Sequence, residues 1–202
     1  MVTVICVLKS GGIYGPDYVA NLKTMVSRHL AIPYHFVCLT DMDIEGGGRL
    51  ANGWPGWWSK IEIFRFGGKA IYLDLDTAIF GDLTSLADAL DRDGAFYMLR
   101  PFARRERWAS GIMAWNGDFS FIFREFRVHH IAEWHWDQRY IVDRLDNHEV
   151  QARAIQDVLP GIYSYKKHCN GNPPADARVV CFHGKPRPHE VGMPYWEMGN
   201  AS

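Results

Sequence analysis

The segment Lys69-Ala70-Ile71-Tyr72-Leu73-Asp74-Leu75-Asp76-Thr77-Ala78-Ile79-Phe80 decides which fold we predict for this chain. Its apolar beginning is typical of a buried strand. Side chains alternate between the two faces of an extended chain, so Asp74 and Asp76 are predicted to point the same way, with Cβ atoms roughly 6–7 Å apart. Both carboxylates then reach one hard divalent cation, which would offset their mutual repulsion and the cost of their desolvation.

The tripeptide Asp-x-Asp recurs in the chain, and its surroundings distinguish the copies. It occurs at positions 41–43, 74–76 and 91–93. Positions 91–93 are predicted to end a helix, with Gly94 as its stop, and positions 41–43 lead into the glycine-rich loop 46–48. Only the copy at 74–76 has apolar residues on both sides, which favours a functional role over a solvated turn.

The N-terminal part alternates strands and helices. We predict strands at 2–8 and 34–39, which are apolar runs, and helices at 17–30 and 57–66, whose apolar residues recur at helical spacing. This order implies a right-handed crossover and a parallel sheet. Ligands of such sheets bind outside the carboxyl ends of the strands. The loop at 9–15 is therefore a candidate nucleotide contact.

Two residues of this part are candidate ligand contacts, and each has a plainer alternative. Tyr14, in the loop at 9–15, is either a platform for a nucleobase or a half-buried turn tyrosine. Lys60 lies one position away from the apolar side of the helix at 57–66, so it is either a surface lysine or a partner for a phosphate. The loop matches neither the Gly-x-Gly-x-x-Gly fingerprint nor a phosphate loop.

The rest of the chain continues with both element types. We predict helices at 83–90, 119–128 and 137–145, and strands at 95–99, 110–118, 162–165 and 178–182. The loop at 100–107 carries four arginines, which fit a solvated face, a lid over a diphosphate or a contact to an anionic acceptor or lipid. Trp134 and Trp136 are either platforms for an acceptor ring or core residues.

Composition narrows the class of protein. The 202 residues are 48% hydrophobic and 22% charged, which is typical of one globular domain. The formal net charge of −1 argues against bulk nucleic-acid binding. The four cysteines lack Cys-x-x-Cys spacing, and Cys6, Cys38 and Cys181, which lie in apolar runs, are predicted to be reduced core residues. No apolar run is long enough for a transmembrane segment and no signal peptide is visible, so we expect a cytoplasmic protein, with contact to a membrane surface left open.

These landmarks together resemble the GT-A nucleotide-sugar glycosyltransferases, most closely glycosyltransferase family 8. The matching pieces, in order, are the opening strand with Tyr14, the strand end at 72–77, the strand Ser110-Gly111-Ile112-Met113, the pair Asp137-Gln138, and the late strand ending in His183-Gly184-Lys185-Pro186. The resemblance implies an α/β, Rossmann-like fold with a mostly parallel central sheet flanked by helices, in a single domain over 1–202. Residues 1–82 would form the nucleotide-binding part. Residues 83–202 would form the acceptor-side part and supply the C-terminal strand that completes a metal site.

The resemblance also implies roles for particular residues. The metal ligands would be Asp74, Asp76 and His183. The nucleotide contacts would be Tyr14, Lys60, Asp74, Leu75, Asp76 and Lys185. Asp137 and Gln138 would act beside the transferred sugar, and Trp134 and Trp136 are the acceptor candidates. Two departures concern the late motif: Lys185 follows His183 by two residues, where the family spacing is wider, and His189 replaces the family's closing tryptophan.

The implied reaction is metal-dependent transfer of a hexose from a nucleoside diphosphate sugar, usually a uridine diphosphate (UDP) sugar, to an acceptor, with retention of configuration. Carboxylate and imidazole ligands suit manganese better than magnesium. The cation would offset the charge that develops on the departing diphosphate. The alternatives are a non-catalytic nucleotide-sugar or glycan-binding domain, a nucleotidyltransferase, and a haloacid-dehalogenase-type phosphatase. The phosphatase would want its threonine or valine two residues after the second aspartate, whereas Thr77 is adjacent.

Overall fold

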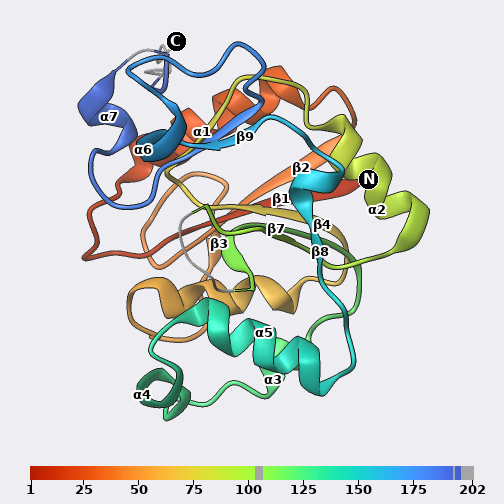
Figure 1. The fold of residues 1–202 in the computed structure, drawn as a ribbon. Coiled ribbons are helices and arrows are strands. Elements are labelled where there is room, and N and C mark those ends of the chain that lie inside the picture. The colour runs from red at the N-terminus through yellow and green to blue at the C-terminus, as the bar shows by residue number, and fades with distance from the viewer. Residues whose placement is uncertain (103–106, 193, 197–202) are drawn as a thin grey trace.

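A large mixed sheet forms the centre of the molecule in the computed structural model, which describes residues 1–102, 107–192 and 194–196 (Figure 1). Its strands are β1 (Val2–Leu8), β2 (Tyr34–Thr40), β3 (Gly48–Arg49), β4 (Gly68–Leu73), β6 (Tyr97–Leu99), β7 (Ala109–Gly117) and β8 (Arg153–Ala154). They lie in the order β3-β2-β1-β4-β7-β6-β8. All neighbours are parallel except β7, which runs antiparallel to β4 and β6. The predicted α/β class and mostly parallel sheet are therefore confirmed.

A second, smaller sheet contains the last strand that the structure describes. It consists of β5 (Thr77–Ile79), β10 (Val179–Cys181) and β9 (Ile162–Ser164), in that order. The strand predicted to end at the acidic pair is present as β4, but the pair lies in a turn and not on an extended chain, and β5 after it belongs to the other sheet. The backbone N–H of Thr77 donates to the carbonyl of Asp74 at 3.1 Å, so the chain turns at the acidic pair as it passes from one sheet to the other.

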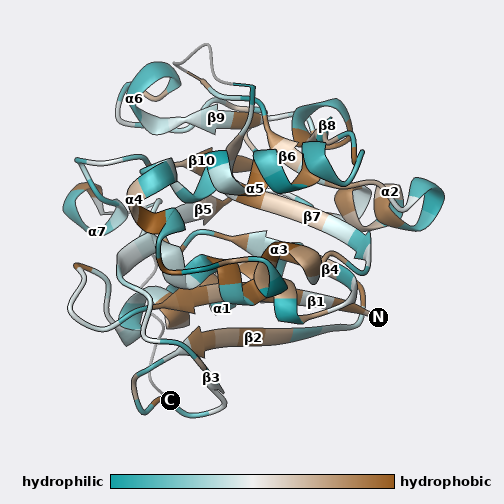
Figure 2. Cartoon of the chain, turned by 90° about the horizontal axis from the view of Figure 1, so that it is seen from below, coloured by the Kyte–Doolittle hydropathy of each residue, from teal (hydrophilic) through white to brown (hydrophobic). Residues whose placement is uncertain are grey.

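Helices cover both faces of the large sheet (Figure 1). One face carries α1 (Pro16–His29) and α2 (Thr84–Asp93), and the other carries the 3₁₀ helix η1 (Gly56–Arg65), α3 (Phe121–Arg124) and α5 (Asp137–Asn147). Two separate apolar cores result, one on each face, and Figure 2 shows apolar residues along the strands between the helical layers. The short elements are α4 (His130–Trp134), η2 (Ile155–Asp157), α6 (Tyr165–His168) and α7 (Pro188–Val191). Across the described ranges, no helix has the length and apolarity needed to cross a bilayer.

The helix predictions differ in accuracy for physical reasons. The α1 helix begins at Pro16, whose missing N–H costs nothing at a helix start, and it buries Val19, Leu22 and Val26 on one side. The helix predicted over 119–128 is wrong in length, because only α3 is helical. Beyond α3 the backbone tightens, with Phe126 N–H donating to the Phe123 carbonyl at 3.2 Å. The Phe126 ring then packs against Trp54 and Tyr140, and this tertiary packing takes precedence over helix propensity.

Candidate active site

A cavity of about 450 Å³ opens where β1 and β4 end at their carboxyl termini, the edge at which parallel sheets bind ligands. It brings together most of the residues predicted to contact a nucleotide. Its walls are formed by Val7, Lys9, Gly12, Ile13, Tyr14, Gly56, Trp57, Ser59, Lys60, Tyr72, Asp74, Leu75, Asp76 and Arg187. The structure therefore places Tyr14, Lys60 and the segment 74–76 at one cavity, although they are far apart in sequence.

The first acid of the pair, Asp74, belongs to a buried polar network. Its Oδ1 accepts a hydrogen bond from the Tyr72 hydroxyl at 2.6 Å and lies 3.0 Å from the Lys60 ammonium. Lys60 also lies 3.2 Å from Asp137 Oδ2, which accepts a hydrogen bond from the Ser110 hydroxyl at 2.8 Å. Burial alone would lower the pKa of Lys60, but Asp137 and Asp74 raise it above its usual value. Lys60 is therefore a charged, buried lysine and not a surface one.

The second acid, Asp76, is held by residues from both ends of the chain. Its Oδ2 accepts hydrogen bonds from the Tyr14 hydroxyl at 2.6 Å and from Arg187 Nη1 at 2.9 Å, and Arg187 also contacts the Tyr14 hydroxyl. Burial, together with the charge of Asp74, raises the pKa of Asp76 to about 6, although Tyr14 and Arg187 act in the opposite direction. Burial and the neighbouring acid therefore outweigh the two hydrogen-bond donors in their effect on the pKa of Asp76.

The acid pair fits a divalent cation, because two carboxylates that disfavour each other's ionisation form an oxygen-donor set of the kind such ions prefer. The predicted third ligand, His183, lies close by in the chain path: the preceding residue, Phe182, donates its N–H to the Asp76 carbonyl at 3.3 Å. The His183 imidazole points elsewhere, with Nε2 2.6 Å from Ser164 Oγ. In the part of the chain that the structure describes, Asp74, Asp76 and His183 do not bring their ligand atoms within 4.8 Å of one another.

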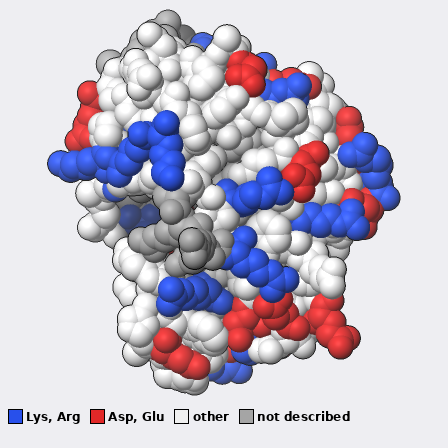
Figure 3. Space-filling view, in the orientation of Figure 1, with Lys and Arg blue, Asp and Glu red and all other residues white. Residues whose placement is uncertain are grey.

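The late motif contributes an arginine that the sequence analysis missed. Lys185 is largely exposed (86% of its side chain) and lies 3.8 Å from Glu190, and it does not line the cavity. Arg187, two residues later, is mostly buried and bonds to Asp76. The wider spacing of the family motif was the indication that pointed beyond Lys185. The nearby helix α6 carries two further cationic side chains, Lys166 and Lys167. Figure 3 shows lysine and arginine side chains gathered over α6 and the loop before α7.

The remaining predicted residues are divided between two places. Asp137 joins the Lys60 network, as described. Gln138 and Trp134 line a different hollow of about 300 Å³, together with Trp108 and residues along α5. Trp136 is exposed and stacks on Trp57 at the rim of the main cavity, with ring centroids 5.5 Å apart. The basic loop predicted at 100–107 lies partly outside the described residues, at 103–106.

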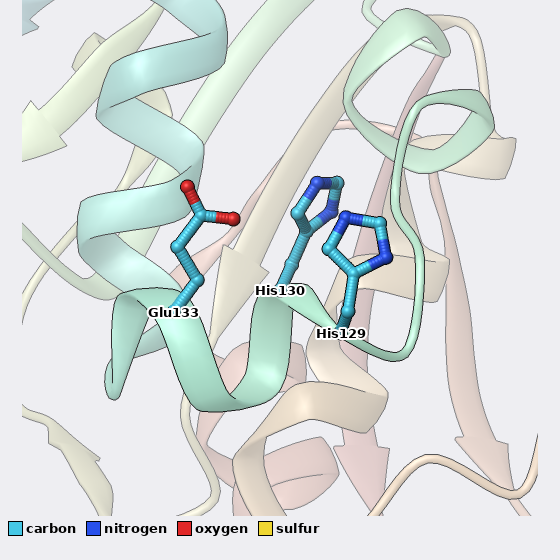
Figure 4. Close-up of side chains that lie close together, drawn as sticks. All are labelled: His129, His130 and Glu133. Carbon is cyan, nitrogen blue, oxygen red and sulfur yellow. The ribbon is translucent and has the colours of Figure 1, made fainter.

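A separate cluster of metal-ligating side chains lies on α4 and the residue before it. His129, His130 and Glu133 each place one ligand atom within 4.8 Å of the others (Figure 4). The Nδ1 atom of His130, however, accepts the backbone N–H of Arg127 at 3.0 Å. A neutral imidazole has one free lone pair, so His130 can bind a metal only by giving up that hydrogen bond. The cluster is thus less suited to a metal than its spacing implies.

No protein-family model matches the sequence, and no curated protein does either. Solved structures are similar to it. The glycosyltransferase GlyE of Streptococcus pneumoniae TIGR4 superposes with a TM-score of 0.64 over 92% of this chain, at 15% identity. The galactosyltransferase LgtC, in complex with donor and acceptor sugar analogs, superposes with a TM-score of 0.59 over 92% of this chain, at 14% identity. The bifunctional glycosyltransferase WbbM gives 0.58 over 93%, at 11% identity.

The coverage of those structures is unequal. This chain spans 88% of the LgtC chain but only 55% of the GlyE chain and 46% of the WbbM chain. Identities this low establish a common fold and leave the activity to be argued from the cavity. The chain therefore has the GT-A fold of these glycosyltransferases, and its resemblance to glycosyltransferase family 8 is confirmed at the level of the fold.

Proposed function

We propose that this chain is a metal-dependent glycosyltransferase that moves a hexose from a nucleoside diphosphate sugar to a carbohydrate or other glycosyl acceptor. UDP is the expected carrier, and retention of configuration is the expected outcome. One observation carries the proposal: Asp74 and Asp76 share a cavity with two mostly buried cations, Lys60 and Arg187, at the carboxyl ends of β1 and β4. That combination suits a phosphate-bearing ligand held through a cation.

The donor would lie across this cavity. Tyr14 offers an aromatic face for the base and Leu75 an apolar surface between the two acids. Lys60 and Arg187 are charged donors that would hold the diphosphate as negative charge develops on it. A manganese or magnesium ion on Asp74 and Asp76 would neutralise that charge further. The Nε2 atom of His183 is engaged with Ser164, so this nitrogen could join the ligands only by giving up that hydrogen bond.

The sugar and acceptor residues lie beyond Lys60. Asp137 contacts Lys60, so we assign Asp137 to the sugar side of the cavity, whereas the next residue, Gln138, lines the other hollow. Trp136 is the proposed acceptor contact, whereas Trp134 lines the other hollow. The division into a nucleotide part (1–82) and an acceptor part (83–202) is kept, except that Arg187 from the second part would serve the nucleotide. A cytoplasmic location is also proposed, and the four free, buried cysteines fit a reducing compartment.

The decisive experiment replaces Asp76 by asparagine. We expect the manganese-dependent release of sugar from a UDP-hexose to fall roughly 100-fold or more in Asp76→Asn, because a group that supports charge stabilisation is lost. The release is measured by coupled detection of UDP, and circular dichroism checks the fold. Asp91→Asn is the matched control, because Asp91 belongs to another Asp-x-Asp tripeptide and pairs with Lys69 instead.

Each other outcome has a defined meaning. Activity at the wild-type level in Asp76→Asn would reject the site. Tight UDP binding without sugar release in the wild-type protein would indicate a non-catalytic binding domain. Release of phosphate from an aryl phosphate, without any nucleotide sugar, would favour the phosphatase alternative.

A further inference from the structure

Two neighbouring tryptophans at the rim of the cavity are unusually exposed. Trp57 is 52% exposed and Trp136 is 40% exposed, and their rings stack at an interplanar angle of 22°. In the described ranges they are the only aromatic side chains of the Phe, Tyr and Trp types that count as exposed. Trp58, the next residue in η1, is by contrast 3% exposed and packs in the core. An apolar surface that is exposed to solvent at the mouth of a cavity is typical of a binding site.

The backbone on both sides directs these rings outward. His135 has φ of 61°, a left-handed conformation that is unfavourable for a residue with a Cβ atom. It forms a tight turn in which Trp136 N–H donates to the Trp134 carbonyl at 2.7 Å. This turn separates α4 from α5 and leaves Trp136 extended at the start of α5. Gly56, also at positive φ, begins η1 immediately before Trp57. Strain of this kind persists where a side-chain position matters.

The pair lies beside the sugar end of the proposed donor site. Trp136 directly precedes Asp137, which holds Lys60. Trp57 lines the cavity with Lys60 and Asp74. Tyr14, the candidate base platform, instead packs against Tyr18 of α1 and contacts Arg187. Tyr14 and the tryptophan pair therefore have different neighbours in the cavity, and the pair adjoins Asp137, the residue that we assign to the sugar side.

We propose that Trp57 and Trp136 form an acceptor subsite that stacks against a pyranose ring. A pyranose presents a flat patch of C–H groups that fits an indole face, while its hydroxyl groups stay in water or reach the polar network around Asp137. The pair offers a short, flat surface with charged residues beside it, which suits a sugar better than a long lipid chain. This inference rests on the proposed function and adds the chemical class of the acceptor together with Trp57, which the sequence analysis did not assign.

The test measures saccharide binding separately from donor binding. Lactose, cellobiose and maltose serve as probes, and saturation-transfer NMR titrations with and without UDP and manganese give their affinities. We expect at least one disaccharide to bind, and its affinity to fall about tenfold in Trp57→Ala and in Trp136→Ala, with an intermediate loss in Trp57→Phe. Trp134→Ala is the matched control, because Trp134 lines the other hollow, and it should keep wild-type affinity. UDP affinity should stay within about twofold in all variants.

Three results would overturn the subsite. They are an absence of binding by all three disaccharides, unchanged affinity in both alanine variants, and a tenfold loss of UDP affinity, which would place the pair against the donor. Separate measurements of UDP binding and saccharide binding distinguish a failure of this inference from a failure of the proposed function. If the donor site is wrong, UDP binding fails in the wild-type protein, but saccharide binding measured without UDP still reports on the tryptophans.

Discussion

At the scale of single residues, Lys60 is the side chain on which the cavity depends. It is 6% exposed and lies between Asp74 and Asp137, at 3.0 and 3.2 Å. A buried lysine is tolerated only when its charge is paired, and here each acid also relies on the lysine. The same ammonium would face the phosphate of a bound donor, so one residue serves both stability and binding.

Replacing Lys60 by methionine should therefore destabilise the protein. The buried Asp137 and the half-buried Asp74 would lose their charged partner, and we expect the free energy of unfolding to fall by about 3 kcal/mol, as measured by urea denaturation. Lys9→Met is the control, because Lys9 and Asp41 form a partly exposed pair at the surface and its loss should cost less than ~1 kcal/mol. Equal losses of unfolding free energy in the two variants would mean that the buried network contributes no more to stability than a surface ion pair.

The cavity residues differ in how far the sequence predicts them. Asp74 and Asp76 were identifiable because acids flanked by apolar residues are rare and need a partner. Arg187 could not be identified, because the sequence of a loop does not show which of its two cations, Lys185 or Arg187, folds back over the site. Trp57 and Trp58 look alike in sequence, and only tertiary packing decides that Trp58 is buried and Trp57 is exposed.

At the scale of elements, Asp93 ties the end of α2 to the edge of the large sheet. Its carboxylate accepts hydrogen bonds from Ala95 N–H at 3.0 Å, the Tyr97 hydroxyl at 2.8 Å and Arg153 Nη1 at 2.6 Å. Burial alone would raise the pKa of Asp93, but these three donors lower it below the ordinary value of 3.8. A carboxyl group with a depressed pKa in the folded state stabilises the fold above its unfolded pKa and loses that contribution as the pH falls.

Asp93→Asn should accordingly destabilise the protein in a pH-dependent way. At pH 7 we expect a loss of about 1 kcal/mol in the free energy of unfolding, because the charge-assisted hydrogen bonds are weakened. The difference from wild type should shrink at pH 3, because the contribution of a carboxyl with a lowered pKa declines as the pH falls below 3.8. Urea denaturation at both pH values measures this. Asp88→Asn, on the exposed side of the same helix, should differ little from wild type at either pH; a gap at pH 7 that persists at pH 3 would contradict the argument.

Element boundaries could be predicted where local chemistry sets them. The α1 helix follows from Pro16 and from its apolar spacing, and the end of α2 follows from Gly94, which adopts φ of 58° after the last turn. The membership of β5 in a different sheet from β4 could not be predicted, because it depends on which strand each segment pairs with. β4 pairs with β1 and β7, whereas β5 pairs with β10, about 100 positions later in the chain.

At the scale of the whole molecule, the cavity is assembled from distant segments. Val7 and Arg187 both line it, and β5 and β10 join the two halves of the chain in the small sheet. A ligand in this cavity would therefore bind the folded chain and not the unfolded one, and it should stabilise the entire structure.

UDP with manganese should raise the melting temperature. At a ligand concentration of 100 times Kd, the stabilisation is about 2.7 kcal/mol, which corresponds to an increase of about 5–10 °C for a protein of this size. Differential scanning fluorimetry measures the increase. EDTA should remove most of it, and Asp76→Asn should not show it. A shift of the same size in EDTA would indicate that the nucleotide is held by Lys60 and Arg187 without a metal.

The hydrogen bond between Arg187 and Asp76 joins residues 111 positions apart. A ribosome that adds roughly 5–20 residues per second needs on the order of 5–20 s to travel from one to the other. During that interval the growing polypeptide already displays both acids, while the arginine and the strand that pairs beside them have yet to be translated. The pocket therefore cannot be completed until the segment with β10 and Arg187 has been translated, and translation products that stop before β10 would carry both acids without the arginine that pairs with Asp76.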